Sequence, residues 1–150
     1  MAAPNRWTDA LDQVLTLVVL LDDDMERALA HVRLTAPRAH LLWQLLHHGP
    51  STQRAIAEAM CVSARNITGL VDGLVATGFV TREPHPTDRR ATLVSFTRHG
   101  ATVAQRLRED QREFARLLFG GMPAQQLDGF TDGLGQVMTR LHELGVASGE

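Results

Sequence analysis

The hydrophobic period of the sequence changes at Phe79, and this change constrains the fold more than any other feature. Residues Phe79 to Glu83 and Ala91 to Phe96 are rich in Val, Thr, Leu and Phe, which favour strands. Between them lies the seven-residue segment Pro84 to Arg90, in which two prolines exclude a helix. This part of the chain therefore predicts a β-hairpin with a stiff, charged tip.

Two short helices are predicted immediately before the hairpin. Ser51 or Thr52 can cap a helix that runs through Met60, and Ser63 can cap a second one that ends near Gly78. The second helix has one apolar face, whose members follow helical spacing: Ile67, Leu70, Val71 and Leu74. Its opposite face is polar and carries Arg65, Thr68, Gly69 and Asp72, with Asn66 on the flank. A short helix, a turn, an amphipathic helix and a β-hairpin, in that order, predict a helix-turn-helix followed by a wing.

The rest of the chain is predicted to be helical. Apolar residues at helical spacing indicate one long amphipathic helix from Trp7 to about Arg33, and a short buried helix follows Thr35 and stops at Gly49-Pro50. Two further helices follow the hairpin, one from Arg98 and one after Pro123, and we expect their apolar side chains, including Leu117 and Leu118, to face inward. The predicted fold class is mostly α (α+β). The expected organisation is a winged domain over residues 34–98, with a helical dimerisation region made of residues 1–33 and 99–150.

Charge is distributed unevenly along a chain of 150 residues whose net charge is −2. The three successive stretches of 50 residues carry −2, +2 and −2, so the basic part is the predicted winged domain. A hydrophobic content of 44% excludes disorder of the whole chain, and the single cysteine, Cys61, excludes an intramolecular disulfide. The sequence shows neither a signal peptide nor an apolar run long enough for a bilayer, so we expect a cytoplasmic protein without a membrane partner.

No pattern typical of an enzyme, a metal site or a cofactor is found in the sequence. The seven histidines show no zinc-finger or metalloprotease spacing, and no nucleophile elbow or glycine-rich phosphate loop occurs. Cys61 lies in the predicted turn, where a partly buried thiol without a function is the alternative to a redox role. We therefore expect no enzyme activity, no metal and no cofactor.

The winged segment resembles the MarR family of bacterial winged-helix transcription regulators. The resemblance covers about residues 34–100. It is carried by these residues: Leu34-Thr35, Leu41 to Leu46, Gly49-Pro50, Ile56 to Met60, Val62-Ser63, Ile67-Thr68, Leu70 to Asp72, Gly78 to Arg82, Pro86, Asp88-Arg89-Arg90 and Val94 to Thr97. It implies a homodimeric, sequence-specific DNA-binding regulator that represses from palindromic promoter sites and is released by a small lipophilic or phenolic effector.

The resemblance also implies which residues meet double-stranded DNA. It places the second helix in the major groove, the wing arginine Arg90 in the minor groove and Arg89 on phosphate, with Asp88 orienting a wing arginine. The full set of expected DNA-binding residues is Thr52, Gln53, Ser63, Arg65, Asn66, Thr68, Arg89 and Arg90. Relatives often carry basic residues where this chain has Gly69 and Gly73, so some contacts of the family are missing here.

An effector pocket is expected between the dimer helices and the winged domain, bordered by His40, Leu42, Trp43 and Leu46. The alternative for Trp43 is a plain core position. The alternative for the whole domain is a winged-helix module that binds protein rather than DNA. Salt dependence separates these two functions, because DNA binding releases counterions.

Overall fold

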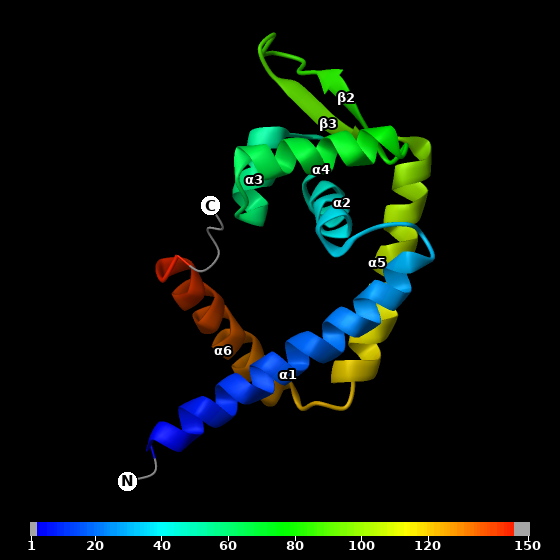
Figure 1. Cartoon of the computed structure of the whole chain (residues 1–150). Helices are drawn as coiled ribbons and strands as arrows, with labels where there is room; N and C mark the ends of the chain where they lie inside the picture. Colours follow the sequence, from blue (N-terminus) through cyan, green and yellow to red (C-terminus); the bar gives the residue numbers. More distant parts are fainter. Residues whose placement is uncertain (1–2, 146–150) are drawn as a thin grey trace. The chain divides into compact units, whose positions relative to one another are not determined.

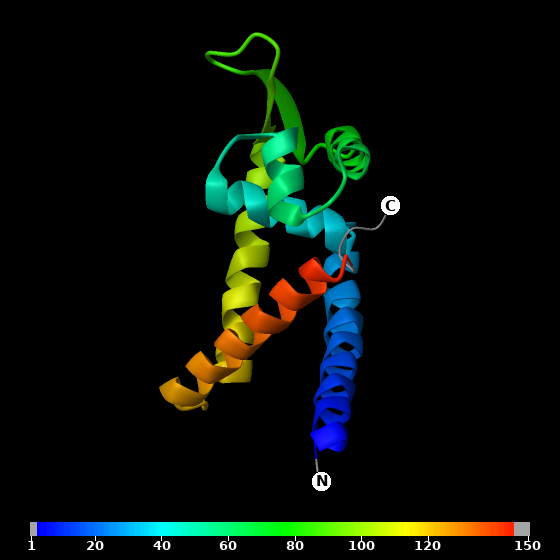
Figure 2. The same cartoon turned by 90° about the vertical axis from the view of Figure 1, so that its left-hand side faces the viewer.

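The computed structural model describes residues 3–145 and is mostly helical, with one small antiparallel sheet (Figures 1 and 2). The chain divides into two compact units, residues 1–39 and 40–150. The elements follow one another in the order α1 (Ala3–Ala30), α2 (Ala36–His48), β1 (Ser51–Thr52), α3 (Gln53–Met60), α4 (Ala64–Ala76), β2 (Val80–Pro84), β3 (Thr92–Phe96), α5 (Arg98–Phe119) and α6 (Ala124–Glu143). This order confirms the predicted fold class.

The first helix ends slightly earlier than its apolar pattern indicates. Arg33 has a φ of 56°, in the left-handed region, and the amide of Leu34 donates to the carbonyl of Leu29 at 3.2 Å. A left-handed residue of this kind terminates a helix and satisfies its last carbonyl groups. The α-helix therefore stops at Ala30 and a turn covers residues 31–33.

The sheet has three strands in the order β1-β3-β2, and all pairs are antiparallel. The hairpin of β2 and β3 is the predicted wing, and its register places Val80 opposite Phe96 and Pro84 opposite Thr92. Pro84 thus belongs to the strand, and the tip of the wing begins at His85. Strand β1 is too short to leave a periodic pattern in the sequence, and it was not predicted.

The core of the winged part is almost entirely aliphatic. Its almost fully buried side chains come from α2, α3, α4, β2 and β3: Leu41, Leu45, Ile56, Ile67, Val71, Leu74, Val80 and Val94. Burial of each such side chain stabilises the fold by about 1.5–3 kcal/mol. Because Ile67, Val71 and Leu74 hold the inner face of α4 in this core, the outer face of α4 is left to solvent.

Large apolar side chains remain exposed on the long helices of the single chain. Trp7 on α1 is 75% exposed, Leu117 on α5 is 74% exposed and Met138 on α6 is 62% exposed. The prediction that Leu117 and Leu118 face inward is wrong for the single chain, since both are exposed. Apolar periodicity shows that a face is to be covered, but it does not say whether the same chain covers it.

None of the helices between residues 3 and 145 combines the length and the apolar character that a membrane span requires.

Candidate nucleic-acid interface

Both helices of the helix-turn-helix begin with a hydroxyl cap. The hydroxyl of Thr52 accepts the amide N–H of Ala55 at 3.1 Å, and the hydroxyl of Ser63 accepts that of Asn66 at 3.2 Å. Between them, Cys61 takes a left-handed conformation with φ of 56° and turns the chain. These caps confirm the predicted helix starts and resolve the choice between Ser51 and Thr52.

The predicted DNA-binding residues of α4 lie on its solvent side. Arg65, Asn66 and Thr68 are exposed, as is Ser63 at the cap. Thr52 and Gln53 are half-buried at the start of α3, where the helix presents free N–H groups. The structure thus brings these residues to one polar surface formed by α3 and α4.

A hydrogen-bonded network connects this surface to the wing. Arg82 on β2 donates from Nε to Oε1 of Gln53 at 3.0 Å and from Nη2 to Oδ1 of Asp72 at 2.5 Å. Gln53 in turn donates from Nε2 to the hydroxyl of Thr68 at 3.2 Å. Because the Arg82 side chain is only 32% exposed, its bonds to α3 and α4 are partly shielded from water. The network sets the position of the wing relative to the outer face of α4.

The wing tip is organised around two side chains. Nδ1 of His85 accepts the amide N–H groups of Thr87 at 3.2 Å and of Asp88 at 3.0 Å. Oδ1 of Asp88 accepts the amide N–H of Arg90 at 2.9 Å. Asp88 therefore orients a wing arginine through its backbone, and the tip holds Arg89 and Arg90 outward on a stiff loop.

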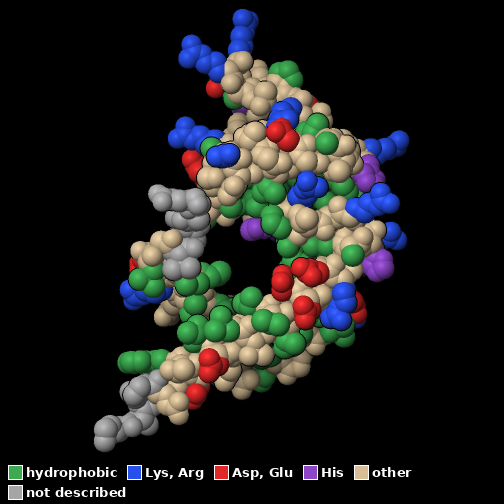
Figure 3. Space-filling model, in the orientation of Figure 1, with side chains coloured by type: hydrophobic (Ala, Val, Ile, Leu, Met, Phe, Trp, Pro, Cys, Tyr) green, Lys and Arg blue, Asp and Glu red, His purple; other side chains and the backbone are tan. Residues whose placement is uncertain are grey.

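Three arginine side chains of this surface are uncommitted. Within residues 3–145, the guanidinium groups of Arg65, Arg89 and Arg90 make no hydrogen bond or ion pair. Figure 3 shows basic side chains extending from the end of the wing. Exposed cations on a rigid loop and on a helix held by its core are suited to bind phosphate and base edges.

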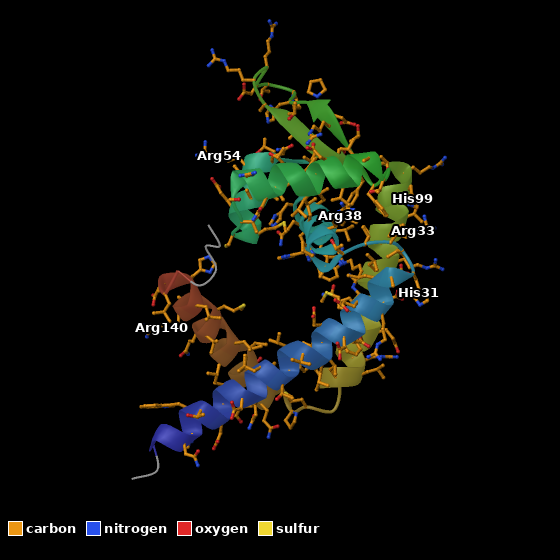
Figure 4. The ribbon with its side chains drawn as sticks, viewed as in Figure 1. His31, Arg33, Arg38, Arg54, His99 and Arg140 are labelled. Atoms are coloured by element: carbon orange, nitrogen blue, oxygen red, sulfur yellow. The ribbon has the colours of Figure 1, made fainter. Side chains whose placement is uncertain are left out.

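The sequence predicted no functional role for four residues of this surface: Arg54, Asp72, Arg82 and His85. Arg54 lies on the first turn of α3, extends outward (Figure 4) and forms an exposed ion pair with Glu58 at 3.3 Å. Opposite charges at Asp72 and Arg82, on either side of the turn at Gly78, are the only signal that could have indicated the network. The sequence carries no signal for the role of His85, because this side chain accepts backbone N–H groups that come close to it only when the wing tip is folded.

The residues expected at an effector pocket occupy different environments on α2. His40 is exposed, Trp43 and Leu46 are half-buried, and Leu42 is fully buried in the core. The rings of His40 and Trp43 lie with their centroids 6.4 Å apart. Nε1 of Trp43 is buried and has no hydrogen-bond partner among the described residues.

The remaining candidate sites are the thiol in the turn and a metal site. Cys61 is exposed, and its thiol lies 3.6 Å from the carbonyl of Glu58. Over residues 3–145, no three His, Cys, Asp or Glu side chains form a group that could hold a metal ion.

The architecture and the exposed polar face of α4 define a winged helix-turn-helix protein. A family model described as "MarR family" matches residues 34–92. The HTH-type transcriptional repressor IacR of Pseudomonas putida is 32% identical over 104 residues, which are 69% of this chain and 62% of that protein. The HTH-type transcriptional repressor NicR of Pseudomonas putida is 33% identical over 92 residues, covering 61% of this chain and 58% of NicR. The chain thus spans about three fifths of the length of these relatives.

The same architecture occurs in solved structures. The crystal structure of the S. aureus MepR–DNA complex superimposes with a TM-score of 0.75 over 86% of this chain and 95% of MepR, at 17% identity. At this identity the likeness concerns the fold alone. The winged part of the chain, residues 34–92, thus matches the MarR family, and the chain is similar to two repressors of the helix-turn-helix type.

Proposed function

We propose that this protein is a transcriptional repressor that binds double-stranded DNA through α4 and the wing. The observation that carries the proposal is the set of three uncommitted arginines, Arg65, Arg89 and Arg90, on one rigid polar surface. The match of residues 34–92 to the MarR family supports it, as do the repressor names of IacR and NicR and the DNA-bound state of MepR.

Each part of the surface has a role in this proposal. The outer face of α4 enters the major groove, where Arg65 and Asn66 reach base edges, while the Ser63 hydroxyl caps the helix. The wing carries Arg90 into the minor groove and Arg89 to phosphate. Thr52, Gln53 and the free N–H groups at the start of α3 contact the phosphate backbone, as does the neighbouring Arg54.

A binding-site selection followed by a salt titration tests this function. We expect a selected DNA sequence whose affinity falls linearly with the logarithm of salt concentration, with a slope of about −0.9 for each phosphate neutralised. A winged-helix module that binds protein would select no sequence, and its interactions would respond only weakly to salt. Failure to select any sequence would therefore favour that second function.

We expect the protein to be a homodimer. The exposed apolar residues of α1, α5 and α6 favour an interface between two copies, because water-exposed stripes of this size are uncommon in monomers. Sedimentation at micromolar concentration should give twice the 16.5 kDa of one chain. Leu117→Glu should shift the protein toward monomer, whereas Arg112→Glu, on the opposite face of α5, should not. A monomeric wild-type protein would contradict this prediction.

We propose in addition that a small lipophilic or phenolic effector binds the protein and releases it from DNA. The buried, unpaired Nε1 of Trp43 supports a ligand that brings an acceptor oxygen, since an unsatisfied buried N–H costs about 1–3 kcal/mol. Trp7→Phe leaves Trp43 as the single tryptophan, and salicylate should quench its fluorescence and weaken DNA binding. If Trp43 is a plain core residue, salicylate will change neither signal.

A further inference from the structure

The network between the wing and α4 determines the orientation of the Gln53 amide. Arg82 carries only N–H donors, so the atom of Gln53 that lies 3.0 Å from its Nε has to be the carbonyl oxygen. The amide nitrogen then faces the other way and donates to the hydroxyl of Thr68 at 3.2 Å. Asp72 accepts a second hydrogen bond from Arg82, from its Nη2. This arrangement makes the Thr68 hydroxyl an acceptor toward Gln53.

The single hydrogen of the Thr68 hydroxyl is also committed. The hydroxyl donates to the carbonyl oxygen of Ala64, one turn earlier on α4, at 3.0 Å. A hydroxyl has one hydrogen and two lone pairs, so no donor is left for a base acceptor and only one lone pair is free. Thr68 is nevertheless exposed on the face of α4 that we assign to the major groove. The γ-methyl group is the remaining part of the side chain that can contact a base.

We infer that Thr68 recognises thymine by an apolar contact between its γ-methyl group and the C5-methyl group of the base. Among the four bases only thymine presents a methyl group in the major groove, and the methyl group of threonine is suited to contact it. This inference rests on the proposed function, because it takes α4 to lie in the major groove. Gln53 acts as a positioning residue, because its amide occupies one lone pair of the Thr68 hydroxyl, and Arg82 and Asp72 fix the orientation of that amide.

Replacement of thymine by deoxyuridine tests the inference directly, because it removes only the C5-methyl group. The operator is first obtained by binding-site selection with the wild-type protein. Each thymine of a half-site is then replaced singly by deoxyuridine, and affinities are measured for wild type, Thr68→Val and Thr68→Ser. Thr68→Val keeps the methyl group and removes the hydroxyl, whereas Thr68→Ser does the reverse. Both changes lie on an exposed position, and circular dichroism checks that the variants are folded.

We expect one thymine per half-site at which deoxyuridine lowers wild-type affinity about fourfold, the effect of removing one buried methyl group. Thr68→Val should keep this discrimination, and Thr68→Ser should bind thymine and deoxyuridine equally. The inference is overturned if no substitution in a selected operator changes wild-type affinity, if Thr68→Ser still discriminates, or if Thr68→Val does not. A hydrogen bond that the free lone pair accepts from adenine or cytosine would not depend on the C5-methyl group, and it would give the first of these results. If no operator is selected at all, the proposed function itself fails.

Discussion

Replacing Gly100 with alanine is expected to lower the free energy of unfolding by about 3 kcal/mol, the upper range for overpacking a well-packed site. Gly100 is buried in the first turn of α5, and a β-carbon built there overlaps the backbone carbonyl of Phe79. A backbone group cannot move aside as a flexible side chain can. The helix and the start of the wing would have to separate.

The region around Gly100 connects three functional elements, which explains the size of the expected effect. The hydroxyl of Thr97 donates to the carbonyl of Gly78, at the end of α4, at 2.5 Å, and accepts the amide N–H of Gly100 at 3.0 Å. The amide of Thr97 donates to the carbonyl of Phe79 at 3.1 Å. The ring of His99 (labelled in Figure 4) packs against that of Phe79 at an angle of 43°, with ring centroids 5.0 Å apart. Separation of these groups would disturb α4, the wing and α5 together.

Urea denaturation at one fixed protein concentration measures the effect of Gly100→Ala, since the stability of a dimer depends on concentration. Gly69→Ala is the matched control, because a β-carbon at Gly69 meets no atom within 4 Å. In an exposed helix this change should be neutral or stabilising by up to about 1 kcal/mol. Equal stability of Gly100→Ala and wild type would show that the close approach to Phe79 is absent in solution.

Arg65→Ala and Arg90→Ala are expected to impair DNA binding in different ways. Arg65, on the outer face of α4, can donate two hydrogen bonds to a guanine edge. Its loss should cost about 1–3 kcal/mol and relax base preference at one position per half-site. Arg90, at the stiff wing tip, is expected to respond to the width and negative potential of the minor groove. Its loss should weaken binding and lower the salt slope by about one, with little change in consensus.

Binding-site selection and salt titration with both variants measure this difference. The consensus should be a palindrome with half-sites about 10 base pairs apart, because a two-fold dimer places its α4 helices one turn of DNA apart. Arg140→Ala, on α6 and paired with Glu143 at 3.2 Å, is the control for the loss of one positive charge. A shifted consensus for Arg90→Ala, with an unchanged one for Arg65→Ala, would reverse the roles of helix and wing.

Local chemistry made most of the winged part predictable. The capping hydroxyls of Thr52 and Ser63, the left-handed glycine at Gly78 and the prolines around the wing tip act on their own neighbours in sequence, so they can be recognised without a structure. Strand β1 could not be predicted, because its two residues form a strand only by pairing with Leu93 and Val94. The exposure of Leu117 could not be predicted from the sequence either, because periodicity does not reveal which surface covers an apolar face.

The sequence by itself determined the order of the elements, the apolar face of α4 and the charged wing tip, because helical and strand periods, caps and prolines act over a few residues. Only the tertiary structure decided what the polar side chains do. Gln53 and Asp72 lie 29 and 10 residues before Arg82 along the chain, and folding brings both within hydrogen-bonding distance of Arg82. Those bonds fix the orientation of the Gln53 amide, and a further bond within α4 occupies the hydrogen of the Thr68 hydroxyl, while the guanidinium groups of Arg65, Arg89 and Arg90 make no bond to the described residues. Donor and acceptor capacity is used up by spatial neighbours, and sequence spacing does not encode that.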